Sequence, residues 1–209
     1  IEAKNLDELY FNTILACLKH GRLYKVDSGS FSGTHRLEFD HATLVVTNPA
    51  HRPLSPTPRP GIPVTTNDEK IEQYFVDDIM DGTLAINEHY RYSSWIVGMP
   101  NSTDLMHKSI PRGTRLNQLG WCIDHFVNSG FGTNHCYMTV GCAEGLKRYD
   151  WPYKNENEKG STECLRGLDL KIKDNKLNLL AYFRSWDLVA GMPENLGGLT
   201  MLMEHAVEE

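Results

Sequence analysis

The chain has 209 residues, of which 40% are hydrophobic and 23% are charged, enough to build one sizeable buried core. We therefore expect a single domain over residues 1–209. The formal net charge of −6 and the pI near 5.8 exclude the basic stripe of a nucleic-acid-binding protein, although a few arginines could still bind one phosphate. No apolar run approaches the length of a membrane span, so no membrane partner is expected.

The first half of the sequence predicts two helices separated by extended chain. Residues 6–20 have helical spacing of apolar side chains and stop at Gly21. Residues 42–48 predict a buried strand, and six prolines from Pro49 to Pro63 predict an extended surface loop. Asn67 or Asp68 then opens a second helix. The expected buried positions of the two helices are Leu6, Leu9, Tyr10, Ile14 and Leu18, then Ile71, Tyr74, Phe75 and Ile79.

The second half predicts a helix over about 114–128, a strand over 136–142 and a long loop over 143–163. Strands at 165–172 and 177–184 flank a polar hairpin turn. The last helix is expected to begin near Asn195. The apolar positions of the two helices are Leu116, Leu119, Ile123, Phe126 and Val127, then Leu196, Leu199, Met203 and Ala206. Strands mixed with long helices indicate an α/β or α+β fold.

The five cysteines are an odd number, and no two of them have C-x-x-C spacing. Cys136 and Cys142 could share a strand face, but they lack the paired-ligand pattern of a zinc site. We therefore expect no metal site, and reduced thiols in a cytoplasmic protein.

The richest polar segment is FRSWDLVAGMPENLGGL, residues 183–199. It places an arginine, a serine, an aspartate and an asparagine at the exit of an apolar strand, one hairpin downstream of Cys164. A buried polar cluster is costly unless it binds something. Ordinary solvated groups at a strand–loop–helix junction are the alternative interpretation.

This pattern, R-S-x-D-(x)3-G-x-P-x-N after a cysteine, resembles the signature of the thymidylate synthase and pyrimidine-nucleotide hydroxymethylase superfamily. The similarity extends to its short methanogen-type archaeal members, from about residue 20 to residue 207. The segments that carry it, in order, are Asp27-Ser-Gly-Ser-Phe-Ser-Gly, Arg52-Pro-Leu-Ser-Pro, Asn87-Glu-His-Tyr-Arg-Tyr and Gly130-Phe-Gly-Thr-Asn. The resemblance implies a large mixed β-sheet flanked by helices, and a homodimer.

The resemblance also implies a covalent mechanism. Cys164 would attack carbon 6 of a pyrimidine, so that carbon 5 can capture a one-carbon unit. A thiolate needs nearby positive charge, and Arg184 and Arg166 are the nearest cations across the predicted hairpin. The other four cysteines are expected to be buried and inert.

The same resemblance assigns nucleotide phosphate to Arg184 and Ser185, since a guanidinium fork and a hydroxyl suit a dianion. Asp187 would bind the pterin of the cosubstrate, which is 5,10-methylene-tetrahydrofolate or a tetrahydromethanopterin analogue. Asn195 would pair with the pyrimidine edge and favour uracil, although it could also simply cap a helix.

Three further assignments are implied by similarity of position. Tyr92 would organise water near carbon 5. Glu72 would be the general base, with Glu88 as a rival, and each could be a solvated helix charge. A glycine-punctuated loop would close over the phosphate with Ser30, Ser32 and Arg36, or be ordinary turn chemistry.

The sequence also departs from the family pattern. Asn134-His135 replaces an adjacent arginine pair, so another arginine (Arg36, Arg52 or Arg115) must help Arg184 with the phosphate. Leu165 follows the cysteine where most members have histidine. The chain ends at Glu209 without the H-x-Y segment, so we expect the family's C-terminal part to be missing.

The first functional hypothesis is reductive methylation of dUMP to dTMP. A 5-hydroxymethylase acting on dUMP, dCMP or CMP is the close alternative, because water instead of hydride would quench the same intermediate. A non-catalytic nucleotide-binding relative is the second alternative. In each case the expected partners are a pyrimidine nucleoside monophosphate and, for the enzymes, a reduced pterin.

Overall fold

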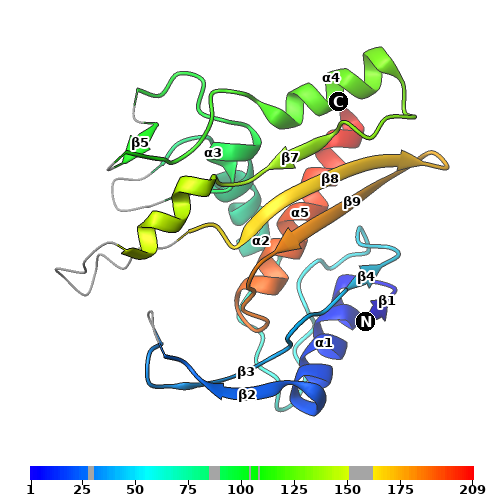
Figure 1. Ribbon diagram of the computed structural model, residues 1–209. Coiled ribbons are helices and arrows are strands. Elements are labelled where there is room, and N and C mark those ends of the chain that lie inside the picture. The colour runs from blue at the N-terminus through cyan, green and yellow to red at the C-terminus, as the bar shows by residue number, and fades with distance from the viewer. Residues whose placement is uncertain (28–30, 85–89, 104, 108, 151–161) are drawn as a thin grey trace. The chain divides into compact units, whose positions relative to one another are not determined.

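The computed structural model of the chain describes residues 1–27, 31–84, 90–103, 105–107, 109–150 and 162–209 (Figure 1). Helices and β-strands are both present, which confirms the α+β class. The described strands form four small sheets, of which the largest has three strands, instead of one large sheet. The chain divides into two compact units, residues 1–72 with 187–200 and residues 73–186 with 201–209.

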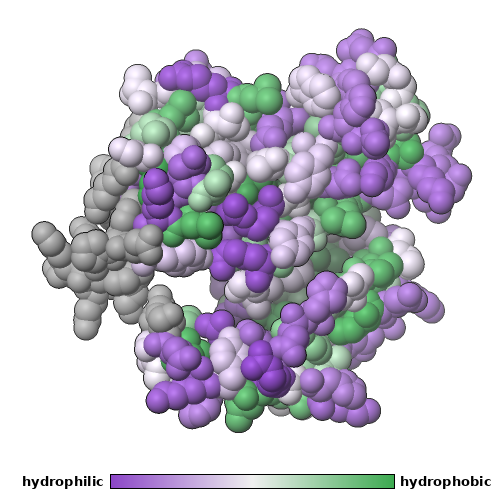
Figure 2. All heavy atoms as spheres, viewed as in Figure 1, coloured by the Kyte–Doolittle hydropathy of each residue, from purple (hydrophilic) through white to green (hydrophobic). Residues whose placement is uncertain are grey.

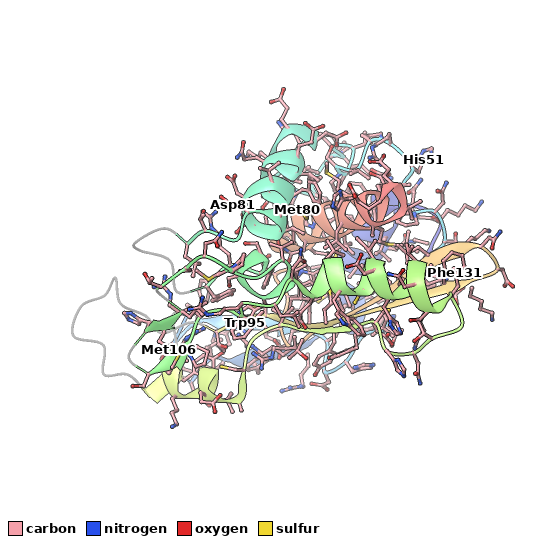
Figure 3. All side chains as sticks on the ribbon, turned by 90° about the horizontal axis from the view of Figure 1, so that it is seen from above. His51, Met80, Asp81, Trp95, Met106 and Phe131 are labelled. Atoms are coloured by element: carbon pink, nitrogen blue, oxygen red, sulfur yellow. The ribbon has the colours of Figure 1, made fainter. Side chains whose placement is uncertain are left out.

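Two helices contribute residues to both units. α2 covers Asp68–Tyr74 and continues into the π-helical turn η1, Phe75–Met80. Ile71 and Ile79 are fully buried, as the apolar pattern predicted. Met80 and Asp81 lie where this helical segment ends (Figure 3). The C-terminal helix α5 covers Gly191–Glu208.

The first unit contains α1, residues Leu6–His20, and four short strands. The strands are β1 (Glu2–Ala3), β2 (Arg22–Lys25), β3 (His35–Glu38) and β4 (Val45–Val46). β2 and β3 form an antiparallel hairpin, and β1 and β4 form a parallel pair. The buried strand predicted over 42–48 is wrong: only two residues pair, with a single neighbour, so Val45 stays 43% exposed.

The bounds of α1 follow from its caps. The Asn5 side chain accepts a hydrogen bond from the backbone N–H of Glu8 at 2.9 Å, which satisfies one of the first-turn donors. At the other end, a Cβ at position 21 would lie 2.5 Å from the Cys17 carbonyl oxygen, so this close approach requires glycine. The predicted helix is confirmed, except that Leu18 is 66% exposed instead of buried.

The second unit is built around the antiparallel sheet β7–β8–β9, whose strands run side by side (Figure 1). Its sheet strands are β7 (Tyr137–Thr139), β8 (Leu165–Lys173) and β9 (Lys176–Phe183). The other elements are α3 (Ser93–Ile96), β5 (Met106–His107), β6 (Ile110–Pro111), α4 (Gln118–Ser129) and the 3₁₀ helix η2 (Ala143–Asp150). β5 pairs with β6 in a separate two-stranded sheet.

The β8–β9 hairpin confirms its sequence prediction. Asp174 and Asn175 have φ values of 51° and 56°, and two left-handed residues make the turn type that matches the twist of paired strands. Leu168 and Leu170 are completely buried on the inner face of the sheet. The register shifts between Leu165 and Gly167, and such a bulge changes the direction of the intervening side chain.

Three predicted boundaries are wrong for local reasons. α4 begins at Gln118 because Asn117 caps it by accepting from Gly120 N at 2.9 Å, so Leu116 precedes the helix and is exposed. The end of α4 at Ser129 agrees with the predicted end before Gly130. Phe131 lies just beyond it (Figure 3), and its ring packs edge-on against that of Phe126. The predicted strand 136–142 is reduced to β7, and the first part of the predicted loop 143–163 is η2.

The buried residues of α5 and α4 show which of the predicted apolar positions belong to the core. In α5 the buried apolar residues are Met192, Leu199 and Leu202, so of the predicted stripe only Leu199 is buried. In α4, Leu119, Cys122 and Phe126 are buried, whereas Val127 is 70% exposed. On the face shown in Figure 2, apolar residues lie in small groups between hydrophilic ones.

Candidate functional site

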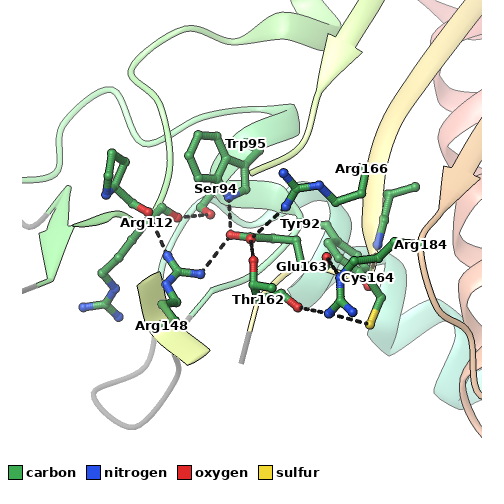
Figure 4. Close-up of polar contacts among 12 residues, drawn as sticks. Tyr92, Ser94, Trp95, Arg112, Arg148, Thr162, Glu163, Cys164, Arg166 and Arg184 are labelled. Carbon is green, nitrogen blue, oxygen red and sulfur yellow. Dashed lines mark hydrogen bonds and ion pairs between the residues drawn. The ribbon is translucent and has the colours of Figure 1, made fainter. Parts of the chain in front are cut away.

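Cys164 and Arg184 occupy the two open ends of the β8–β9 hairpin. Cys164 directly precedes β8 and Arg184 directly follows β9. The Arg184 backbone N–H donates to the Cys164 carbonyl at 2.9 Å, and Arg184 Nη2 lies 3.7 Å from Cys164 Sγ (Figure 4). The half-buried thiol therefore contacts a guanidinium, the kind of neighbour that stabilises a thiolate.

Arg184 is held by the chain that leads to the cysteine. Its Nε donates to the Glu163 carbonyl at 3.0 Å, and Nη2 donates to the Thr162 carbonyl at 2.8 Å. The guanidinium carbon lies 5.8 Å from the centre of the Tyr149 ring. These contacts fix where the guanidinium meets the sulfur.

Tyr92 also contacts the chain next to Cys164. Its hydroxyl accepts from the backbone N–H of Leu165 at 3.4 Å, and its ring lies 5.8 Å from that of Tyr90. Burial, and then the nearby Tyr90 and Cys164, raise the pKa of Tyr92, so its hydroxyl stays protonated. Tyr92, Cys164 and Arg184, three of the predicted site residues, are thus brought together.

A charged network lies next to Cys164, and of its residues the sequence prediction included only Arg166, as a cation near the thiol. Glu163 is completely buried, and its carboxylate accepts from Trp95 Nε1 at 3.1 Å, Arg148 Nη1 at 3.1 Å and Thr162 Oγ1 at 2.6 Å. Arg166 Nη1 lies 3.6 Å away. We call these five residues the Glu163 network (Figure 4). The one available signal was a carboxylate directly beside the candidate nucleophile.

The other sequence positions singled out in the second unit are exposed or fall outside the described residues. Ser185 is exposed and directly follows Arg184. His135, at the position of the missing arginine pair, is exposed, and its ring lies 5.3 Å from that of His125. Glu88 falls outside the described residues.

Six predicted site residues lie in the segments of the first unit, residues 1–72 and 187–200. Arg36 lies on β3, with Nη1 3.7 Å from Glu38 Oε2. Glu72 is exposed on α2. Ser32 donates to the Asp27 carbonyl at 3.0 Å, whereas Ser30 falls outside the described residues. Their proposed roles remain predictions.

Asp187 and Asn195 are the other two. Asp187 shapes the entry to α5: its Oδ1 accepts from the N–H groups of Val189 and Ala190, both at 2.9 Å. Because α5 begins at Gly191, Asn195 lies inside the helix, so the alternative that Asn195 caps it is wrong.

The remaining cysteines have environments unlike that of Cys164. Cys17, Cys122 and Cys136 are buried. Burial raises the pKa of each of these thiols, to about 12 for Cys122. The predicted burial is confirmed for these three, whereas Cys142 is partly exposed.

Among the described residues, no three His, Cys, Asp or Glu side chains lie close enough to hold a metal ion. The described helices likewise include none with the length and apolar character needed to cross a membrane.

No family model matches the chain. A protein of Methanosarcina mazei described as "Putative thymidylate synthase" is 23% identical over 209 residues, covering 100% of this chain and 80% of that protein. A protein of Methanosarcina acetivorans with the same description is 23% identical over 205 residues, covering 98% and 78%.

Among solved structures, thermostable thymidylate synthase A from Bacillus subtilis matches with a TM-score of 0.52 and 14% identity, covering 98% of this chain and 73% of that one. This likeness confirms the fold. The two methanogen proteins support the relationship of this chain to the thymidylate synthase superfamily and to its methanogen-type members.

Proposed function

We propose that this chain is a thymidylate-synthase-like enzyme that converts dUMP to dTMP. Cys164 Sγ adds to carbon 6 of the uracil, and carbon 5 then attacks the methylene carbon of a methylene-tetrahydropterin. Loss of the carbon 5 proton expels the tetrahydropterin nitrogen and leaves an exocyclic methylene group on the pyrimidine. Hydride from the tetrahydropterin reduces this methylene to the methyl group, and the pterin leaves as a dihydropterin. Elimination of the thiolate then frees the product. The observation that carries the proposal is the 3.7 Å contact between Arg184 Nη2 and Cys164 Sγ.

The surroundings of the thiol support this role. Burial raises the pKa of both Tyr92 and Tyr149, and the nearby Cys164 raises each further. Protonated phenols beside the sulfur can donate to a bound pyrimidine or to water. Leu165, where most of the family has histidine, is completely buried in the sheet and supplies only its backbone.

The donor would be 5,10-methylene-tetrahydrofolate or a tetrahydromethanopterin analogue. Asp187 is the proposed pterin ligand, because its Oδ1 is already fixed by two backbone N–H groups and its carboxylate is therefore held in one orientation. Arg184, Ser185 and Arg36 are the proposed phosphate ligands, and Glu72 is the proposed general base.

A homodimer is proposed from the outer face of the β7–β8–β9 sheet. Tyr137, Leu180 and Tyr182 point to this face and are 53%, 63% and 58% exposed. Large exposed apolar side chains on one sheet face favour an interface. A solution mass near one 23.7 kDa chain at micromolar concentration would contradict the dimer.

Tritium release from 5-tritiated dUMP, with each methylene donor, tests the reaction. We expect release together with dTMP as the product. Release with 5-hydroxymethyl-dUMP, or activity only on dCMP or CMP, would instead identify a hydroxymethylase. Binding of dUMP without release would identify a non-catalytic relative.

The base preference has its own test. Asn195→Asp should shift preference toward cytosine, because a protonated carboxyl can pair with N3 while its other oxygen accepts from the 4-amino group. The ratio of the kcat/KM values for dUMP and dCMP should change by an amount equivalent to a free energy on the order of 1–3 kcal/mol. A wild-type preference for dCMP would contradict the assignment of uracil.

A further inference from the structure

Burying the charges of the Glu163 network costs free energy. Glu163 and Arg148 are each 1% exposed at the side chain, and burying an ion pair costs desolvation that the pair rarely recovers. A core of the same volume made of apolar side chains would often be as stable.

The network is connected to Cys164 through two residues of backbone. The Glu163 side chain is held by Arg148, which also donates from Nη2 to the Pro111 carbonyl at 2.7 Å. The carbonyl of the same Glu163 accepts from Arg184, the residue whose Nη2 contacts the Cys164 sulfur. Thr162 takes part in both sets of contacts. Its hydroxyl donates to the Glu163 carboxylate, and its carbonyl accepts from Arg184.

On the basis of the function proposed above, we propose that Glu163 is a positioning residue for the nucleophile. Anchored by Arg148, Trp95 and Thr162, it fixes the Thr162–Cys164 segment so that the carbonyls of residues 162 and 163 hold the Arg184 guanidinium against Cys164 Sγ. Glu163 thus acts on the sulfur through Arg184 and not through its own charge.

Charge and position predict opposite results, which makes the proposal testable. Arg148, Arg166 and Arg184 with the single carboxylate of Glu163 give a local charge of +2. Removing the carboxylate raises this charge, and more positive charge by itself would favour the Cys164 thiolate. Loss of the anchor would instead separate Arg184 from the sulfur and make the thiolate less favourable.

The experiment measures the alkylation rate of Cys164 by iodoacetamide across neutral and alkaline pH in the intact chain. Peptide mass spectrometry follows residues 160–166, the tryptic fragment that contains this cysteine. For Glu163→Gln we expect alkylation at neutral pH to slow by roughly tenfold or more, the size of a lost charge-assisted contact, with the pH profile moved to higher pH. Faster or unchanged alkylation would overturn the proposal.

A double variant separates the two effects a second time. Glu163→Gln combined with Arg148→Met keeps the local charge at +2 while it removes the anchoring pair, and it leaves no unpaired charge of that pair in the core. We expect alkylation to remain slow. A wild-type rate in the double variant would show that the anchoring pair is not needed and would overturn the proposal.

A milder variant covers the case in which the core substitutions prevent folding. Thr162→Val removes one donor to Glu163 and keeps Arg148 in place, so alkylation should slow by about two- to tenfold. A wild-type rate and pH profile in this variant would count against positioning by the network.

Arg22→Met is the matched control, since it breaks an exposed ion pair, 2.7 Å to Asp40, in the other unit. It should leave the alkylation of Cys164 unchanged, and an equal loss in this control would overturn the specific role of Glu163. None of these assays uses nucleotide or pterin. The expected alkylation pattern without tritium release would therefore refute the proposed reaction while leaving the positioning role standing.

Discussion

Cys136 and Cys164 occupy equivalent places in one sheet. Each directly precedes a strand, β7 or β8, and each carbonyl accepts a backbone hydrogen bond at 2.9 Å, from Leu170 and Arg184 respectively. The sulfurs differ: that of Cys136 is completely buried and contacts the Cys122 carbonyl at 3.7 Å, whereas that of Cys164 contacts the Arg184 guanidinium. The charge that the chain places beside the thiol, and not its position in the sheet, distinguishes a candidate nucleophile from a core residue.

The largest effect is expected when the candidate nucleophile of these two cysteines is removed. Cys164→Ala should lower tritium release by at least about 10³-fold and abolish the adduct with 5-fluoro-dUMP, because no other group replaces a covalent nucleophile. The matched Cys136→Ala variant should keep both and lose roughly 0.5–1.5 kcal/mol of unfolding free energy. Persistence of the adduct in Cys164→Ala would refute the assignment.

A smaller effect is expected when only the cation is removed. Arg184→Met deletes the contact to sulfur and leaves the Thr162 and Glu163 carbonyls without this donor. Alkylation of Cys164 at neutral pH should fall by roughly 10- to 100-fold, in line with the loss of hydrogen bonds to a charged group. Alkylation of the buried Cys136 in the same samples is the internal control, and a rise there would indicate general unfolding.

The buried Cys122 thiol should make the free energy of unfolding depend on pH. The pKa of the Cys122 thiol rises from 9.0 to about 12, chiefly through burial, so the folded state keeps a proton that the unfolded state gives up above pH 9. This contribution is therefore complete below about pH 9 and is lost as pH rises toward 12, by no more than about 4 kcal/mol.

Cys122→Val removes that titration. Denaturant unfolding of wild type and variant between pH 8 and about pH 11 should show a shallower loss of unfolding free energy in the variant. Equal slopes would mean that the thiol is not protected in the folded chain.

The smallest expected effect concerns Tyr92. Its hydroxyl accepts one long hydrogen bond, 3.4 Å from Leu165 N. Tyr92→Phe should therefore cost about 0.5–1.5 kcal/mol of unfolding free energy and leave the alkylation rate of Cys164 within about threefold. A much larger change in alkylation would show that the phenol also acts on the sulfur. Thermal unfolding and alkylation of the same samples check both values.

The sequence predicted the parts of the candidate site that are joined by local structure. Asp174 and Asn175 specify a tight turn, and a hairpin with that turn must bring the chain before β8 against the chain after β9. The proximity of Cys164 and Arg184 therefore follows from turn chemistry and strand pairing. The helix over 6–20 was predictable for the same reason, since Asn5 and Gly21 mark its ends within the sequence.

Only the tertiary structure decided what surrounds this pair. Trp95, Arg148 and Glu163 are far apart in the sequence, and nothing local distinguishes Arg148 or Glu163 from solvated surface charges. Their burial depends on packing between α3, η2 and the start of β8, which periodicity does not encode. Cys136 illustrates the limit: the sequence places it beside a strand, as it does Cys164, but only the folded chain brings its sulfur to the carbonyl of Cys122, 14 positions away.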